Sequence, residues 1–110
     1  MTGMLELNDR QGFDTETLQV GVGVSSLTET KYKPANEDTA KAALITLEGA
    51  NIRYWSSSRT LGGVVSPTAE EGHLVKDGGQ VGLDSYNSIR HFRYLRVEDG
   101  VTKIQVEYYR

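Results

Sequence analysis

The sequence predicts an all-β fold: a single-domain antiparallel β-sandwich or small barrel of about six to eight short strands. Two observations lead to this prediction. Several short segments carry apolar residues at every second position, and glycine-containing turns separate them. The chain has 110 residues, a length that fits one domain with one core. We expect an extended N-terminal arm at residues 1–15 and the β-sandwich domain at residues 16–110.

The N-terminal region divides into a polar stretch and a predicted strand. Residues 1–15 show little periodicity, which is typical of a segment that is poorly ordered on its own. Apolar residues then recur at every second position: Leu18, Val20, Val22 and Val24. This alternation predicts a half-buried strand. Two glycines lie between these apolar residues and leave the other face bare, which suits close approach by another backbone or subunit.

The segment "AKAALITLEGANIRYW" gives the strongest strand signal. Apolar residues occupy both faces around Leu44, which predicts a central strand. A helix over residues 38–48 is the competing interpretation, because Ala, Lys and Leu favour helices. "EGAN" resembles a hairpin turn. In the strand after it, Ile52 and Tyr54 share one face, and Arg53 and Trp55 share the other.

The sequence of the C-terminal third predicts two short strands followed by a hairpin. "HLVKDGGQVGLDS" indicates two short strands around an Asp-Gly-Gly turn, and "SYNSIRHF" indicates a turn or one turn of 3₁₀ helix. "FRYLRVEDGVTKIQVEYY" indicates a hairpin with an Asp-Gly turn. We expect Ile104, Val106 and Tyr108 to face the core. If Leu95 and Val97 also face inward, the side chains between and before them face outward.

The long segment between Trp55 and His73 is rich in Ser, Thr, Gly, Pro and Glu. Loops of more than about 12–15 residues are uncommon inside a compact domain and are usually functional or disordered. Leu61, Val64 and Val65 have no obvious core register. Exposed apolar residues on a soluble domain often mark a partner site, so we expect the loop 56–72 to pack on a neighbouring subunit or another partner.

The residues that carry catalysis or bind metals do not form a recognisable set. The chain has no cysteine, and its two histidines, His73 and His91, are not paired at metal-ligand spacing. No serine lies in a Gly-x-Ser-x-Gly motif, and "GVGVSS" lacks the third glycine of a nucleotide-binding loop. Adjacent carboxylates lie in predicted loops, where solvation is the usual state. We therefore expect no enzyme activity, no cofactor and no metal.

Charge and hydropathy narrow the range of partners. The formal net charge is −3, whereas a nucleic-acid-binding domain usually carries a strongly basic face. The one basic cluster, "IRHFRYLR", fits a plain surface strand, a protein interface or, less well, single-stranded nucleic acid. No apolar run approaches the roughly 20 residues that span a bilayer, and no secretory signal is recognisable. We expect a protein that is assembled in a cytoplasm and contacts neither nucleic acid nor membrane.

The order "ALITLEG…IRY…PTAEEGHLV…IRHFRYLRV…IQVEYY" resembles a group of small tailed-bacteriophage virion proteins, over roughly residues 27–110. In that group an Asp-Gly turn usually follows Ile-Arg-Tyr, whereas "WSSSRTLGGVVS" fills the space here. The positions that carry the resemblance are Ala43, Leu44, Ile45, Glu48, Gly49, Ile52, Arg53, Tyr54, Pro67, Thr68, Gly72, His73, Ile89, Phe92, Arg93, Arg96, Val106 and Tyr108.

The resemblance implies a compact β-sandwich or barrel that is a non-enzymatic virion protein, such as a capsid decoration or cement protein. Its partners would be the major capsid protein and further copies of itself as a homo-oligomer. It would lie on the capsid exterior after assembly in the host cytoplasm. A neck, head-completion or tail-attached protein is the alternative within virions. A carbohydrate-binding β-sandwich module is the alternative from another class, with Trp55 and several tyrosines available to stack on sugars.

The partner interface that we expect combines the arm, the long loop and the outward residues of the penultimate strand. Its predicted members are Leu5, Leu7, Phe13, Trp55, Arg59, Leu61, Val64, Val65, Tyr94 and Arg96.

Overall fold

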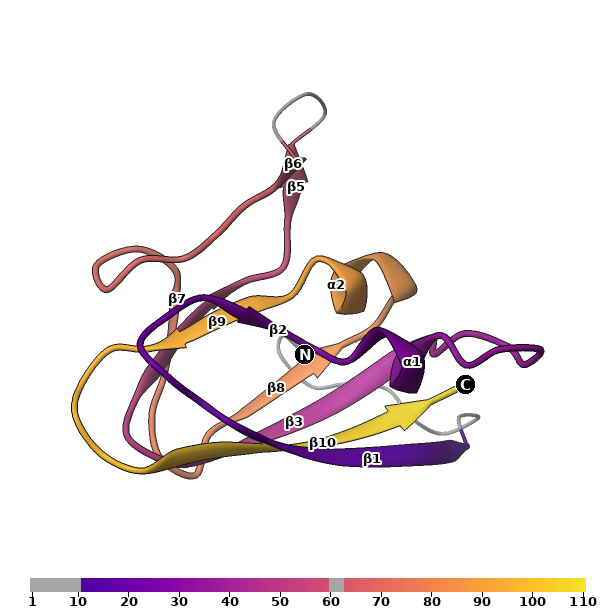
Figure 1. Cartoon of the computed structure of the whole chain (residues 1–110), viewed down its shortest axis with the longest axis horizontal. Coiled ribbons are helices and arrows are strands. Elements are labelled where there is room, and N and C mark those ends of the chain that lie inside the picture. Colours follow the sequence, from indigo (N-terminus) through magenta and orange to yellow (C-terminus); the bar gives the residue numbers. More distant parts are fainter. Residues whose placement is uncertain (1–10, 60–62) are drawn as a thin grey trace, which may run out of the picture.

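The computed structural model describes residues 11–59 and 63–110. They form two four-stranded antiparallel sheets, which confirms the predicted all-β fold (Figure 1). Sheet A contains, in spatial order, β1 (Gly12–Gln19), β10 (Thr102–Tyr109), β3 (Ala42–Gly49) and β8 (Gln80–Leu83). Sheet B contains, in spatial order, β2 (Ser25–Ser26), β9 (Arg93–Arg96), β4 (Ile52–Trp55) and β7 (His73–Val75). A separate hairpin joins β5 (Ser58–Arg59) to β6 (Gly63–Val64).

The hydrophobic core lies between the two sheets. Sheet A contributes the inward residues of its two central strands, which pair directly: Ile45 with Val106, and Leu47 with Ile104. Sheet B contributes Ile52 and the aromatic rings of β9 and its flank. The remaining buried members of the core are Val20, Leu27, Tyr32, Ala40, Ala43, Val75, Val81, Leu83, Ile89, Phe92, Tyr94 and Tyr108. The prediction that β3 is a central strand is correct, and the helix over residues 38–48 does not form.

Both predicted hairpins are wrong in their pairing, although their strands exist. β3 and β4 follow each other closely but lie in different sheets, and so do β9 and β10. The turns at Gly49 and Gly100 therefore carry the chain from one sheet to the other. Gly49 has a φ of +108°, and a Cβ at this position would lie 2.1 Å from the carbonyl oxygen of Val101. Only glycine fits there, so the turn at Gly49 can lie close to the backbone that follows Gly100.

The N-terminal boundary also differs from the prediction. β1 begins at Gly12, so residues 12–15 belong to sheet A rather than to an arm, and Phe13 packs on the core with its ring 6.5 Å from that of Tyr108. Residues 1–10 lie outside the described part. The predicted strand over residues 18–24 ends at Gln19, and the valines after Val20 lie in a loop. The alternation misleads here because the strand turns toward the other sheet after Val20.

Two short helices lie at the end of the sandwich away from the β9–β10 turn (Figure 1). α1 spans Glu29–Tyr32, and α2 spans Tyr86–Arg90 within the segment for which a turn was predicted. The Ser85 side chain accepts a hydrogen bond from the Ser88 amide at 3.0 Å and so caps α2. Ile89 is the buried residue of this helix and inserts into the core.

A polar network crosses from sheet A toward sheet B beside the core. The Glu16 side chain on β1 accepts a hydrogen bond from the Tyr108 hydroxyl and another, at 2.6 Å, from the hydroxyl of Thr28. Burial, followed by the hydrogen bond to Glu16, raises the pKa of Tyr108 well above its usual value. Burial also raises the pKa of Tyr94 to about 12, with a smaller contribution from Glu16. We call Glu16, Thr28 and Tyr108 the Glu16 network.

Candidate partner interface

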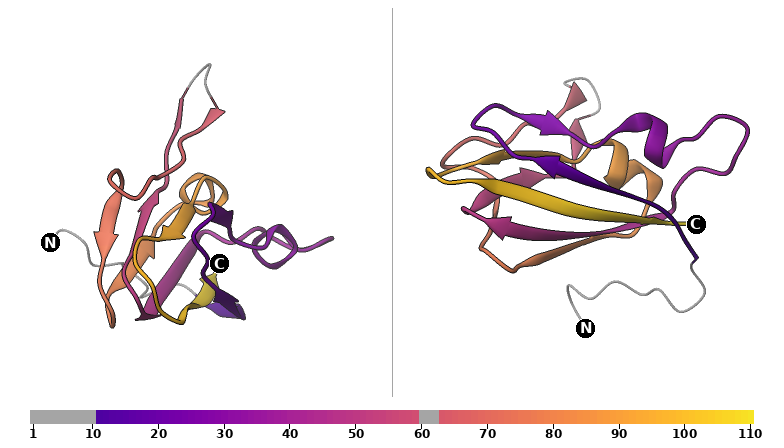
Figure 2. Two further views of the ribbon diagram at one scale, coloured as in Figure 1. Left: turned by 60° about the vertical axis from the view of Figure 1, so that its left-hand side comes forward. Right: turned by 60° about the horizontal axis from the view of Figure 1, so that its bottom comes forward.

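The β5–β6 hairpin projects away from both sheets, as Figure 1 and the left panel of Figure 2 show. Ser58 pairs with Val64 and Arg59 with Gly63, and the Val65 amide donates to the carbonyl oxygen of Ser57 at 3.0 Å. The predicted 56–72 loop therefore contains a strand pair. Val64 and Val65 are half-buried, so they are not fully exposed in the isolated chain.

The return segment of the long loop is fastened to β4. The guanidinium of Arg53 donates from Nε to the carbonyl oxygen of Ala69 at 3.1 Å and from Nη1 to that of Gly72 at 2.8 Å. The hydroxyl of Thr68 accepts the amide of Glu71 at 2.9 Å, which closes a compact turn between these two carbonyls. Arg53 therefore lies against the outer face of sheet B and holds the return segment there.

Gly72 and Pro67 complete the same attachment. Gly72 has a φ of +125°, and a Cβ there would lie 3.0 Å from the carbonyl oxygen of Tyr54 and 3.1 Å from the Cβ of Pro67. Pro67 itself is buried. The "IRY" and "PTAEEGH" motifs thus meet in space and form the base of the hairpin. We call Arg53, Pro67, Thr68 and Gly72 the hairpin base.

Trp55 lies at the start of the hairpin and contacts His73 across the sheet. Their rings are 5.0 Å apart in an edge-on arrangement, and the His73 ring also lies 5.1 Å from that of Tyr54. Trp55 is half-buried. Trp55 and His73 therefore both take part in ring packing within sheet B.

The basic cluster "IRHFRYLR" is split between core and surface. Phe92, Tyr94 and Leu95 are buried, so the prediction that Tyr94 faces outward is wrong. Arg93 donates to the carbonyl oxygens of Arg90 at 2.9 Å and Phe92 at 2.8 Å, where it satisfies the C-terminal end of α2.

His91 lies in the same cluster, and its surroundings disfavour the protonated imidazole. Partial burial, then the charges of Arg90 and Arg93, lower the pKa of His91. Arg93 is engaged in hydrogen bonds and His91 has a lowered pKa, so the cluster presents fewer free cations than its sequence indicates.

The penultimate strand ends on Arg96, which is half-buried rather than outward. Its backbone amide donates to the carbonyl oxygen of Gly21 at 2.8 Å, and its Nη1 donates to that of Gly100 at 2.8 Å. Arg96 therefore ties the β1–β2 loop and the β9–β10 loop together at one end of the sandwich.

That end also carries exposed valines that the sequence did not identify. Val22 is 71% exposed and Val101 is 86% exposed. They lie in the two loops that Arg96 joins, which Figure 1 shows together at one end of the molecule. Alternation placed Val22 on the apolar face of a predicted half-buried strand, so its exposure was not expected. We call Val22 and Val101 the loop-end valines.

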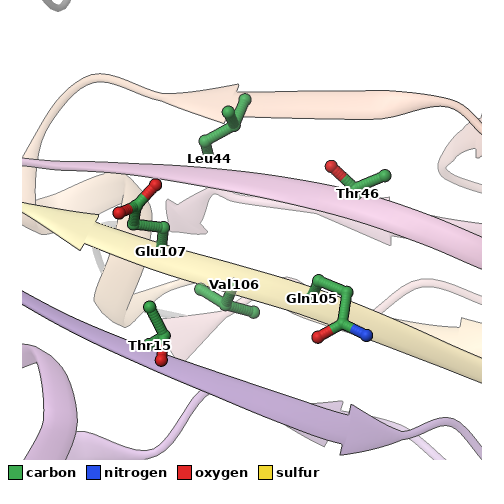
Figure 3. Close-up of a pocket in the computed structure, with 6 residues that line it drawn as sticks. All are labelled: Thr15, Leu44, Thr46, Gln105, Val106 and Glu107. Carbon is green, nitrogen blue, oxygen red and sulfur yellow. The ribbon is translucent and has the colours of Figure 1, made fainter. Parts of the chain in front are cut away.

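A shallow hollow lies on the outer face of sheet A (Figure 3). Thr15 and Thr46 flank it from β1 and β3, and Gln105 and Glu107 rise from β10 between them. Leu44 and the strand at Val106 complete the lining. The hollow offers hydroxyl, amide and carboxylate groups on an open surface, which is not the enclosed apolar site usual for a small ligand.

The predicted interface residues therefore do not form one surface. Trp55 is the last residue of β4 in sheet B, Val64 lies in the separate hairpin, and Arg96 is the last residue of β9. Phe13 packs on the core and Tyr94 lies within it. Leu5, Leu7 and Leu61 lie outside the described residues, and for Arg59 only the backbone pairing with Gly63 is described.

Comparison with known proteins adds no relative. No family model matches the chain, and neither a curated protein nor a solved structure matches it. Within residues 11–59 and 63–110, no three His, Asp or Glu side chains are grouped as metal ligands would be. None of the helices in those ranges is long and apolar enough to span a membrane.

Proposed function

We propose that this protein is a non-enzymatic virion structural protein that binds the assembled capsid surface as a decoration or cement protein. The observation that carries the proposal is the β5–β6 hairpin, which projects from a compact sandwich and carries apolar residues away from the core (Figure 1). A two-stranded hairpin is marginally stable in water by itself. A partner that packs against it would supply the contacts that the sandwich does not.

The hairpin base gives this proposal a second support. Arg53, Thr68 and Gly72, which the resemblance to phage virion proteins singles out, fix the segment that leads back from the hairpin. The base sets the direction in which the hairpin leaves sheet B. Since many identical sites repeat over a capsid, weak contacts of a directed element can add up to firm attachment once copies are linked.

Co-sedimentation tests the proposal with a matched pair of variants. Heads assembled without this protein are mixed with the wild-type protein, with a V64S/V65S variant, or with a V22S/V101S variant. We expect the wild-type and loop-end variants to sediment with the heads and the hairpin variant to stay in the supernatant. If the wild-type protein fails to bind, the proposed function is wrong. If only V22S/V101S fails, the contact lies at the loop end instead.

Copy number distinguishes the positions within a virion. A number proportional to the capsomers indicates decoration, whereas a single ring of copies indicates a neck, head-completion or tail-attached protein. Quantitative mass spectrometry of purified virions measures this number. The carbohydrate-binding alternative has less support, because the Trp55 ring already packs against His73.

A further inference from the structure

Among the described residues, β1 is the one long strand at the four edges of the two sheets. β2, β7 and β8 contain two, three and four residues, whereas β1 contains eight. Short edge strands limit unwanted pairing between chains, and a long edge presents a row of unpaired backbone groups. In Figure 1, no described element continues sheet A beyond β1.

The direction of the backbone groups on β1 follows from one hydrogen bond. The Val20 amide donates to the carbonyl oxygen of Thr102 on β10 at 2.9 Å. In an antiparallel pair, alternate residues bond to the partner strand, so Glu16 and Leu18 also point their backbone groups toward β10. Thr15, Thr17 and Gln19 then point their backbone N–H and C=O groups outward, away from β10.

A local contact agrees with this direction. The Thr15 amide donates to the carboxylate of Asp14 at 2.8 Å, so it turns away from β10. The amides of Thr17 and Gln19 gain no backbone partner from another segment within the described residues. Their side chains are exposed, as is that of Thr15.

We propose that a second copy of this chain pairs with β1 in antiparallel fashion, about a two-fold axis at Thr17. Thr17 would then exchange both backbone hydrogen bonds with Thr17 of the other copy, and each Gln19 amide would donate to the opposing Thr15 carbonyl oxygen. The two A sheets would join into one continuous sheet. Isologous pairing of this kind is the usual geometry of a homodimer.

The side chains at this edge favour a second copy as the occupant. In the proposed register, Thr17 faces itself and Thr15 faces Gln19, so no like charges meet on the outer face. The inward Glu16 is already bonded to Tyr108 and Thr28, and Lys31 lies 3.3 Å from Asp14 as its ion pair. The strand is thus self-complementary in chemistry as well as in backbone geometry.

Engineered cysteines test the register directly, because the chain has no cysteine of its own. Residues that form a hydrogen-bonded antiparallel pair have Cα atoms about 5.5 Å apart, which is within the range of a disulfide. Under mild oxidation we expect T17C to form a covalent dimer. T15C and Q19C should each cross-link poorly alone and well when mixed. T46C lies on the same face but away from the edge and is the matched control.

Analytical ultracentrifugation of the cysteine-free protein gives an independent measurement. We expect a dimer mass for the wild type and a monomer mass for T17K, which would place two ammonium groups across the two-fold axis. T46K should stay dimeric, and circular dichroism checks that all variants are folded. A monomeric wild type, or equal cross-linking of T17C and T46C, would overturn the proposal. The inference does not rest on capsid binding, so failed co-sedimentation would leave it standing.

Discussion

The sandwich body and the β5–β6 hairpin differ in what holds them together. The body buries large side chains between two sheets and adds the Glu16 network across one side. The hairpin has two residue pairs of its own and depends on the hairpin base for its position. We therefore expect most of the stability to reside in the body, and substitutions in the hairpin to leave the fold intact.

The largest expected effect comes from removing a central ring from the body. Phe92 is fully buried, and its ring lies 5.2 Å from that of Tyr54 and 5.5 Å from that of Tyr94. We expect Phe92→Ala to lower the free energy of unfolding by about 3–5 kcal/mol, because it removes apolar contacts and leaves a cavity. Urea denaturation followed by circular dichroism measures the change. A loss below about 1 kcal/mol would contradict the placement of Phe92 at the centre of the core.

The Glu16 network should contribute less than the core. Tyr108→Phe removes the hydroxyl that donates to Glu16 but keeps the ring, so we expect a loss of about 1–2 kcal/mol, because Glu16 loses one of its donors and keeps the hydrogen bond from Thr28. Tyr109→Phe is the matched control, because its hydroxyl donates to the exposed Glu107 and should matter less. The same denaturation experiment compares them. Equal losses in both variants would mean that the Glu16 network adds nothing.

Alkaline pH should weaken the body through Tyr94. Its pKa is raised from 10.0 to about 12, mainly by burial, so the folded state favours the neutral phenol. The stability that it contributes is complete below about pH 10 and is lost as the pH rises from 10 toward 12. We expect wild-type stability to fall over this window and Tyr94→Phe to show a shallower fall. Parallel curves would show that Tyr94 does not titrate with unfolding.

The sequence predicts most strands correctly because alternation is a local property. Ile104, Val106 and Tyr108 face the core as expected. Pairing is not local: a turn such as Glu98-Asp99-Gly100 can close a hairpin or carry the chain across to the other sheet, and the residues are the same in both cases.

Burial on β9 shows the second limit of sequence reasoning. Tyr94 faces the core, yet its neighbour Leu95 is also buried, on the opposite face. The cross-strand partner of Leu95 there is Arg53, whose side chain holds the return segment of the long loop. Because β9 is covered on both faces, its sequence shows no alternation of polar and apolar residues, and the sequence could not show which of Tyr94 and Leu95 faces outward. The hairpin base was equally hidden, because its two motifs meet only after folding.

The hairpin base should affect local more than global stability. Arg53→Met keeps much of the apolar stem but removes both hydrogen bonds to the return segment. We expect a loss of about 1 kcal/mol in the free energy of unfolding, together with faster amide hydrogen exchange at Thr68 and Glu71. Arg90→Met, at an exposed position of α2, is the control and should leave exchange at those amides unchanged. Unchanged exchange in Arg53→Met would show that other contacts hold the segment.

The smallest effect on stability is expected from substitutions in the described residues of the β5–β6 hairpin. Val64 and Val65 are half-buried but are not members of the core, so V64S/V65S should lower the free energy of unfolding by less than about 1 kcal/mol. Val81→Ser is the matched control within the body: Val81 is 5% exposed and belongs to the core, so its loss should exceed about 2 kcal/mol. If the hairpin variant unfolded as readily as the core variant, these valines would belong to the folding core. Their loss of capsid binding would then be a consequence of unfolding rather than of a missing contact.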